Sequence, residues 1–321
     1  MKKFIIYTFL YLLPVLISAI LLEIVLRQIP NDYSYKKNYL DTHADEIETL
    51  ILGSSHSYYG IDPVYFSDNT FNAAHVSQSL TYDYEILKRY DEKLVSLKTV
   101  VIPISYFTLW SKLSNGTESW RIKNYIIYYG ITNEEDSLKF HFEISSNSLI
   151  TNIVRLKSYL QGINNITCSK QGWGTSYSSK NAQNLEKTGK TASIRHTRNS
   201  IYSFENKKLF ADNGLFLDSI INICHKHNAK VLLFTPPAYK TYREHLNEKQ
   251  LNAMIKTANK VANSYSNCTY TNLMTDSTFI SADYYDADHL SEIGAKKLSI
   301  LIDRYIENTK NGNCQSQLRR H

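Results

Sequence analysis

The sequence predicts an α/β fold with a mainly parallel sheet, preceded by one membrane-spanning helix. Two features support this prediction: an uncharged apolar stretch near the N-terminus, and short apolar runs that alternate with helical patterns from about residue 47 onward. Short continuous apolar runs are typical of strands buried on both faces. Strands that alternate with helices form βαβ units, in which helices cover both faces of a parallel sheet.

The apolar stretch covers residues 4–22, contains no charged side chain and follows Lys2 and Lys3. As a helix it would rise roughly 28 Å, enough to cross the hydrocarbon core of a bilayer. Residues 23–27, which begin with Glu23 and end with Arg27, follow it rather than the small residues of a cleavage site, so an uncleaved anchor is favoured over a cleaved signal peptide. The basic pair before the span predicts a cytoplasmic N-terminus, with the remaining chain outside the cytoplasm.

The expected organisation follows from composition and periodicity. A transmembrane anchor covers residues 1–28, a polar, tyrosine-rich stalk residues 29–46, the α/β domain residues 47–308 and a polar tail residues 309–321. Residues from about 107 to 205 interrupt the alternation and hold all three tryptophans, which predicts an inserted cap. Strands are expected at 49–52, 70–74, 99–104, 230–235 and 268–273, and helices at 82–94, 212–228, 248–264 and 293–306.

The composition excludes several classes of protein. The formal net charge is only +6, and no stripe of Lys and Arg accompanies it, so a nucleic-acid partner is not expected. The four cysteines have no CxxC spacing and no histidine cluster beside them, so no metal site is expected. Cys224 lies in an apolar helical pattern typical of a core residue, whereas a disulfide among the other three stays open.

A first group of chemically interesting residues, Gly53-Ser54-Ser55, directly follows the first expected strand. Ligands of open α/β sheets bind beyond the carboxyl ends of strands, and a serine at a following helix N-terminus has backbone N–H groups beside its oxygen. The alternative is a pair of helix-capping serines. The pattern is not the nucleophile elbow of α/β-hydrolases, which needs glycine where Ser57 stands.

A second group precedes the last expected helix, where Asp286 and His289 are three residues apart. That spacing would bring both side chains to one side of a helical turn, so the carboxylate could orient the imidazole as a general base. Asp288 is a competing orienter, although neighbouring positions of a turn point in different directions. The alternative is a surface histidine at a helix start, with acidic residues that favour the helix N-terminus.

Together the two groups resemble the SGNH (GDSL-type) hydrolase superfamily, in which a serine follows the first strand and an Asp-x-x-His block stands near the C-terminus. Gly53-Ser54-Ser55 matches the first block, with Ser54 in place of the aspartate, and Asp286 to His289 matches the last. The resemblance implies a flavodoxin-like three-layer fold and no cofactor. It makes Ser55 the nucleophile, His289 the base and Asp286 its orienter, with the serine oxygen about 2.6–3.2 Å from the imidazole.

The chain departs from this family in two further blocks. No glycine follows the second strand in residues 72–78, and no asparagine follows the third in residues 102–106, so the usual additional oxyanion donors are missing. Ser77, Gln78 and Ser105 are the candidates to replace them.

The resemblance implies two alternative functions. Membrane-anchored members of this superfamily with a serine-rich first block resemble proteins of cell-envelope acyl transfer. The first alternative is therefore an extracytoplasmic esterase or O-acyltransferase at a bacterial inner or plasma membrane, acting on an acylated envelope glycan or lipid. The second is an inactive SGNH-like envelope protein that binds a glycan or a membrane-bound acyltransferase partner.

Overall fold

The computed structural model describes residues 1–133 and 136–310. Within these ranges the chain forms two compact units. Unit 1 contains residues 1–37 and 116–167, and unit 2 contains residues 38–115 together with the described chain from residue 168 onward.

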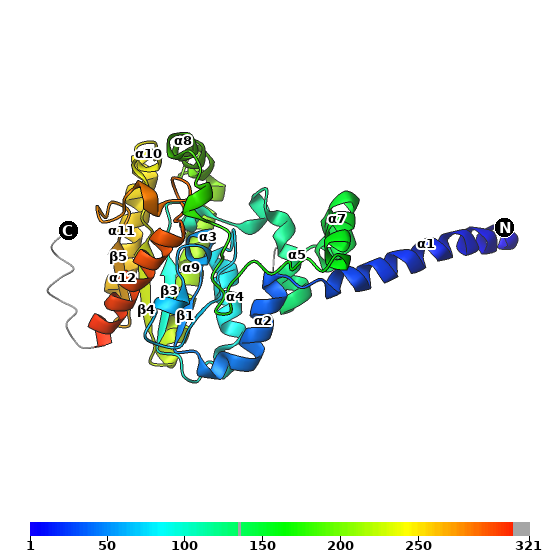
Figure 1. Ribbon diagram of the computed structural model, residues 1–321, viewed down its shortest axis with the longest axis horizontal. Helices are drawn as coiled ribbons and strands as arrows, with labels where there is room; N and C mark the ends of the chain where they lie inside the picture. Colours follow the sequence, from blue (N-terminus) through cyan, green and yellow to red (C-terminus); the bar gives the residue numbers. More distant parts are fainter. Residues whose placement is uncertain (134–135, 311–321) are drawn as a thin grey trace. The chain divides into compact units, whose positions relative to one another are not determined.

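A five-stranded sheet with the order β2-β1-β3-β4-β5 forms the centre of unit 2 (Figure 1). Every neighbouring pair of strands is parallel. The strands are β1 (Thr49–Ile51), β2 (Thr70–Asn72), β3 (Thr99–Pro103), β4 (Lys230–Thr235) and β5 (Cys268–Asn272). All five expected strands are therefore present, and their order is that of flavodoxin-like sheets.

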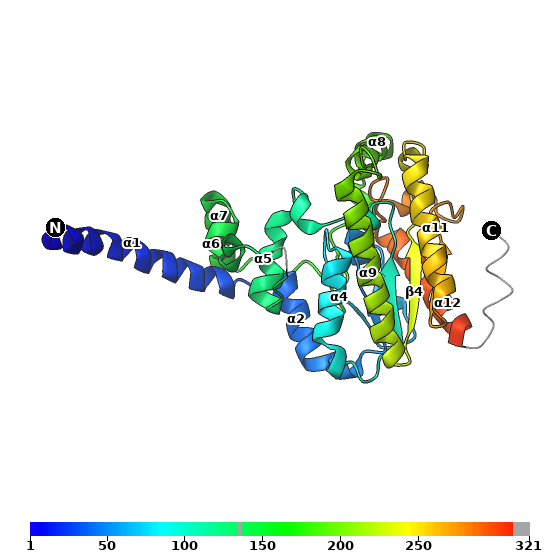
Figure 2. The same ribbon diagram turned by 180° about the vertical axis from the view of Figure 1, so that it is seen from behind.

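Helices cover both faces of this sheet. Helices α4 (Leu80–Arg89), α9 (Phe204–Lys226) and α11 (Glu248–Ser264) lie in front of it in Figure 2, and α12 (Glu292–Lys310) lies on the opposite face. Successive side chains of a strand point to opposite faces of the sheet, so each strand contributes to the core on both faces. On the face that α12 covers, Val101 of β3 packs in a buried core cluster with Leu298 of α12. The predicted three-layer α/β architecture is confirmed.

Unit 1 groups the N-terminal helix with part of the expected cap. It contains α1 (Lys2–Gln28), α5 (Ile122–Asn124), a π-helical turn (Tyr125–Tyr129), α6 (Glu143–Ser146) and α7 (Leu149–Leu160). Residues 168–205, the rest of the expected cap, belong to unit 2 and contain α8 (Leu185–His196), and the inserted cap stays a prediction. The expected stalk contains helix α2 (Asp32–His43), which begins in unit 1 and ends in unit 2. Most of the expected polar tail, including Cys314, lies outside the described residues.

Helix α1 is long and apolar enough to cross a membrane, and only 6% of its most apolar window is buried within the protein. Its C-terminal end is bonded to α6. The Glu23 carboxylate accepts hydrogen bonds from the backbone N–H groups of Glu143 and Ile144, both at 3.0 Å, and pairs with Arg27 at 2.6 Å. Because a helix leaves its first N–H groups without intrahelical partners, Glu23 satisfies two donors that α6 cannot satisfy itself.

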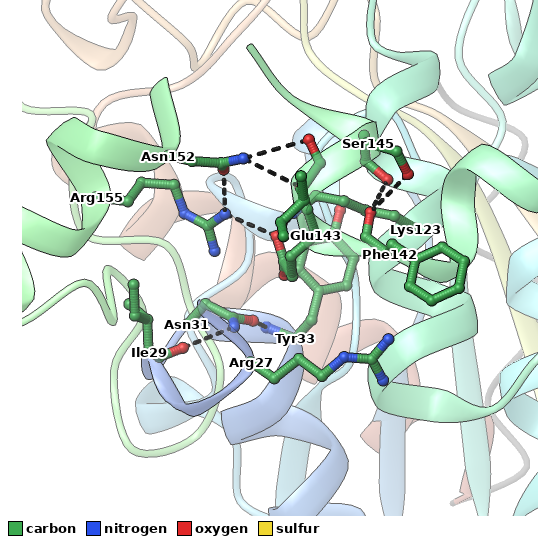
Figure 3. A network of polar contacts seen from close by, with 12 residues as sticks. Arg27, Ile29, Asn31, Tyr33, Lys123, Phe142, Glu143, Ser145, Asn152 and Arg155 are labelled. Carbon is green, nitrogen blue, oxygen red and sulfur yellow. Dashed lines mark hydrogen bonds and ion pairs between the residues drawn. The ribbon is translucent and has the colours of Figure 1, made fainter. Parts of the chain in front are cut away.

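A buried ion cluster holds the rest of unit 1 together (Figure 3). The Glu143 carboxylate is fully buried and accepts hydrogen bonds from Lys123, from Arg155 at 2.7 Å and from the Tyr128 hydroxyl at 2.7 Å. Burial lowers the pKa of Lys123 to about 8, although Glu143 opposes this. Burial also disfavours the Glu143 carboxylate, but the two cations outweigh it and hold the pKa of Glu143 below its usual range.

We expect Glu143→Ala to destabilise unit 1 by about 3–5 kcal/mol, because the buried Lys123 ammonium loses its counter-charge. Hydrogen exchange of the full chain in detergent should then accelerate in residues 116–167 and stay unchanged in β4. The double variant Lys123→Met/Glu143→Leu removes both buried charges and should restore most of the protection. A double variant that exchanges as fast as Glu143→Ala would show that the unpaired Lys123 charge is not what destabilises the unit.

Candidate active site

The turn after β1 is shaped by Gly53, whose φ of +111° lies in the left-handed region. A Cβ atom at this position would lie 2.3 Å from Cδ of Pro103, so only glycine fits against the end of β3. The Gly53 N–H donates to the buried Asp83 carboxylate at 2.7 Å, which fixes the turn from the other side. Helix α3 (Ser55–Tyr58) begins immediately afterwards, so Ser55 stands in the first turn of a helix at the carboxyl end of β1.

The loop before α12 holds the second group. Tyr284 and Leu290 form an antiparallel bridge, and Oδ1 of Asp286 accepts the backbone N–H groups of Asp288 at 3.0 Å and of His289 at 2.8 Å. Asp286 and His289 therefore approach each other within a bridged loop, and the expected helical turn is not present there. The carboxylate that faces the imidazole is itself held by two backbone donors.

The structure brings Ser55, His289 and Asp286 together. Oγ of Ser55 lies 2.8 Å from Nε2 of His289, although the two residues are 234 positions apart in the sequence. Nδ1 of His289 lies 3.0 and 3.1 Å from the two oxygens of Asp286. The hydroxyl, the imidazole and the carboxylate thus form a continuous hydrogen-bonded chain at the carboxyl edge of the sheet, where ligands of such sheets bind.

Asp288 also lies close to this imidazole, contrary to the expectation that it would point away. Its Oδ1 is 3.6 Å from Nδ1 of His289, and its side chain is buried. Burial alone would lower the pKa of His289, but Asp288 and Asp286 together raise it to about 9. The charged imidazole in turn keeps the pKa of Asp288 below its usual range, even though burial opposes ionisation. The neighbouring acidic side chains therefore favour the charged form of the imidazole.

The three candidates for oxyanion donors have different environments. The Gln78 side-chain amide donates to Asp83 at 2.7 Å, and Oγ of Ser105 hydrogen-bonds with Nδ1 of His56 at 2.6 Å. Both groups thus help to build the site. Ser77 adopts a φ of +61°, a strained conformation for a residue that is not glycine. The roles of Ser77, Gln78 and Ser105 as oxyanion donors stay predictions.

Two further histidines near His289 were not found from the sequence. Nε2 of His56 and Nδ1 of His196 lie 3.7 and 3.8 Å from Oδ2 of Asp288. Burial lowers the pKa of both rings, that of His196 to about 3, so both are neutral. His56 directly follows Ser55, but nothing in its spacing distinguishes it from an ordinary helix residue. His196 comes from α8, which the sequence did not connect with the site.

A stack of three tyrosines borders the imidazole. Tyr177 is sandwiched between Tyr59 and Tyr285, with ring centroids 3.6 and 3.9 Å away and nearly parallel planes. The stack presents Tyr177 to His289 at a centroid distance of 5.4 Å and nearly perpendicular planes. Since both faces of Tyr177 are covered by other rings, this residue shields the imidazole and offers no open face for a sugar.

The site also offers a group of metal-ligand atoms, contributed by His56, Asp288 and His289 within 4.8 Å of one another. Both ring nitrogens of His289 already face partners, Ser55 and Asp286, and Nδ1 of His56 bonds with Ser105. An ion held by His289 would have to displace one member of the hydrogen-bonded chain. The donor set therefore fits proton transfer better than metal binding.

Comparisons with known proteins do not assign a family. No protein-family model matches the chain, and no curated protein matches it in sequence. Among solved structures, a protein provisionally described as a platelet activating factor from Streptococcus pneumonia is 10% identical, with a TM-score of 0.43 over 92% of this chain and 98% of that chain. A provisionally described acylhydrolase from Bacteroides fragilis is 12% identical, with a TM-score of 0.40 over 84% of this chain and 95% of that chain. At these levels of similarity neither description transfers to this chain.

We expect Gly53→Ala to lower the free energy of unfolding by at least about 2 kcal/mol, because its methyl group meets Pro103 and its φ is unfavourable. The matched control is Gly162→Ala. Gly162 also has a positive φ, of +72°, but a Cβ there would meet nothing within 4 Å, so only the backbone strain of about 1 kcal/mol remains. Urea unfolding of the full chain in detergent, followed by circular dichroism, compares the two. Equal losses would show that the contact with Pro103 does not constrain the turn.

Proposed function

We propose that the chain is an SGNH-like serine acyl-ester enzyme. The hydrogen-bonded chain from Ser55 through His289 to Asp286 carries this proposal, because it joins a nucleophile, a base and an orienting carboxylate from distant segments. A serine hydroxyl hydrogen-bonded only for structural reasons would not need an imidazole that is itself held by a carboxylate.

The chemistry follows from these positions. Oγ of Ser55 attacks the carbonyl carbon of an ester while Nε2 of His289 takes the hydroxyl proton. The tetrahedral intermediate collapses to an acyl-enzyme, and the same proton passes from His289 to the departing alkoxide. Water or a sugar hydroxyl then attacks the acyl-enzyme while His289 accepts its proton, and the bond from Oγ of Ser55 to the acyl group breaks as that proton passes from His289 to Oγ. Water as acceptor makes the enzyme an esterase, and a sugar makes it an O-acyltransferase.

Negative charge on the carbonyl oxygen would be stabilised at the start of α3. The first N–H groups of a helix have no intrahelical acceptor, and Ser55 stands in that first turn. Ser77, Gln78 and Ser105 are the side chains proposed to add donors. A gap in this set would cost about 10²- to 10³-fold in rate for each missing donor, so a slow or specialised enzyme fits the site.

The proposed setting is the outer side of a bacterial inner or plasma membrane. Helix α1 would cross the bilayer, with Lys2 and Lys3 on the cytoplasmic side and the rest of unit 1 and all of unit 2 on the other. An enzyme held there meets envelope lipids and polysaccharides, so we propose an acylated glycan or lipid as substrate and a membrane-bound acyltransferase as partner.

The nucleophile can be tested with a fluorophosphonate, which labels activated serines. We expect labelling at Ser55 and its loss in Ser55→Ala and His289→Ala, whereas Asp286→Asn should label more slowly because only the orientation of the base is damaged. Turnover of a small ester should fall by about 10⁴-fold or more in the first two variants and by less in the third. Ser54→Ala is the matched control, because the neighbouring hydroxyl makes no hydrogen bond.

Failure of the wild-type chain to label or to cleave any ester would contradict the proposal. The non-catalytic alternative, a protein that binds a glycan or a membrane-bound acyltransferase, would then be favoured.

The raised pKa of His289 predicts an alkaline pH profile. Only the neutral imidazole can accept the Ser55 proton, so kcat/KM should rise with pH and level off above about 9. Asp288→Asn removes one of the charges that favour the imidazolium, which lowers this pKa and moves the rising limb to lower pH. Asp212→Asn, at a surface ion pair on α9, should leave the profile unchanged. An unchanged profile in Asp288→Asn would show that this carboxylate does not control the base.

A further inference from the structure

Helix α7 of unit 1 has an apolar face that the protein leaves uncovered. Leu149, Ile150, Ile153 and Val154 are each more than half exposed, and so is Leu160 at its C-terminal end. The first four are spaced i, i+1, i+4 and i+5, which places them on one side of an α-helix. Soluble surfaces rarely present so many large apolar side chains together on one face of a single short helix.

The opposite face of α7 is held inside unit 1 by polar contacts (Figure 3). Asn152 is fully buried and donates to the carbonyl oxygen of Glu143 at 3.3 Å, and Arg155 binds the Glu143 carboxylate at 2.7 Å. The buried ion cluster thereby determines which side of α7 points outward. The apolar residues cannot turn inward without breaking these bonds.

The position of α7 beside α1 indicates what covers the exposed face of α7. Both α6 and α7 pack against α1, and all three belong to unit 1. In Figures 1 and 2, α7 runs across the direction of α1 and lies on the side of unit 1 from which the long apolar part of α1 extends. The exposed apolar side chains of α7 and those of α1 therefore lie in one unit, on two helices that pack against each other.

We propose that the outward face of α7 lies in the interfacial layer of the same lipid bilayer that α1 crosses. The proposal rests on the membrane-anchoring role of α1 proposed above. An amphipathic helix in this position buries its apolar side chains about 5–10 Å into the boundary between headgroups and acyl chains. Lys157, which is exposed between these side chains, can extend its ammonium group to the headgroups along its apolar stem.

A second attachment restricts the orientation of unit 1 relative to the membrane. A single spanning helix leaves the attached unit free to rotate about the helix axis and to tilt. An interfacial helix that crosses the direction of α1 removes both freedoms for unit 1. Glu23, bonded to α6 at the end of the span, would then lie at the membrane surface rather than within the hydrocarbon.

The test uses the full chain in lipid nanodiscs of phosphatidylcholine and phosphatidylglycerol, with single nitroxide labels. The background is Cys168→Ser/Cys314→Ser, because Cys224 and Cys268 are buried and burial raises the pKa of both thiols. A nitroxide at Ile150→Cys or Ile153→Cys should collide often with oxygen, which concentrates in lipid, and severalfold less with an aqueous nickel chelate. Thr151→Cys, on another side of α7, should show the reverse.

Two further labels separate the outcomes. A label at Leu12→Cys, within α1, reports the anchor itself, and one at Leu215→Cys, an exposed apolar position of unit 2, should remain open to the nickel chelate. Lipid exposure at Leu12 with full nickel exposure at Ile153 would overturn the proposal for α7 and leave the anchor intact. Nickel exposure at Leu12 would overturn the anchor, and the proposal for α7 with it.

Discussion

The close approach of Gly53 to Pro103 is the constraint on which the candidate site depends. Strands β1 and β3 are neighbours in the sheet, and their carboxyl ends come so near that a methyl group does not fit between them. The chain must therefore leave β1 in a left-handed conformation and start a helix at once, which places Ser55 at its first turn. The Asp83 carboxylate reinforces the turn through the Gly53 N–H, while burial raises the pKa of that carboxyl to about 7.

The electrostatics of the site follow from a second constraint, the burial of two carboxylates beside one imidazole. Asp286 is aligned with Nδ1 of His289 by backbone donors and so orients the ring, whereas Asp288 acts on the ring mainly through its charge. One carboxylate would suffice to orient a base. The second makes the imidazolium more stable; in the proposed reaction this strengthens His289 as a base but leaves less of the ring neutral at pH 7.

The two units bury different kinds of side chain in their cores. Unit 2 buries apolar side chains between a sheet and helices on both faces, which needs no specific charge. Unit 1 has less apolar core and is organised by Glu143 and the side chains that bind it. Its apolar side chains point outward on α1 and α7 instead. This inversion is expected of a segment that meets lipid, because lipid solvates apolar side chains and leaves the interior to polar contacts.

Apolar periodicity and turn chemistry act over a few neighbouring residues, so they were enough to predict the strands, the apolar span, Ser55 directly after the first strand, and Asp286 and His289 before the last helix. It also correctly placed Cys224 in the core. The approach of Asp288 to His289 could not be predicted in this way, since it depends on the bridged loop rather than on residue spacing. The grouping of residues 116–167 with α1 likewise depends on contacts such as Glu23 to α6, which join segments 120 residues apart and leave no local pattern in the sequence.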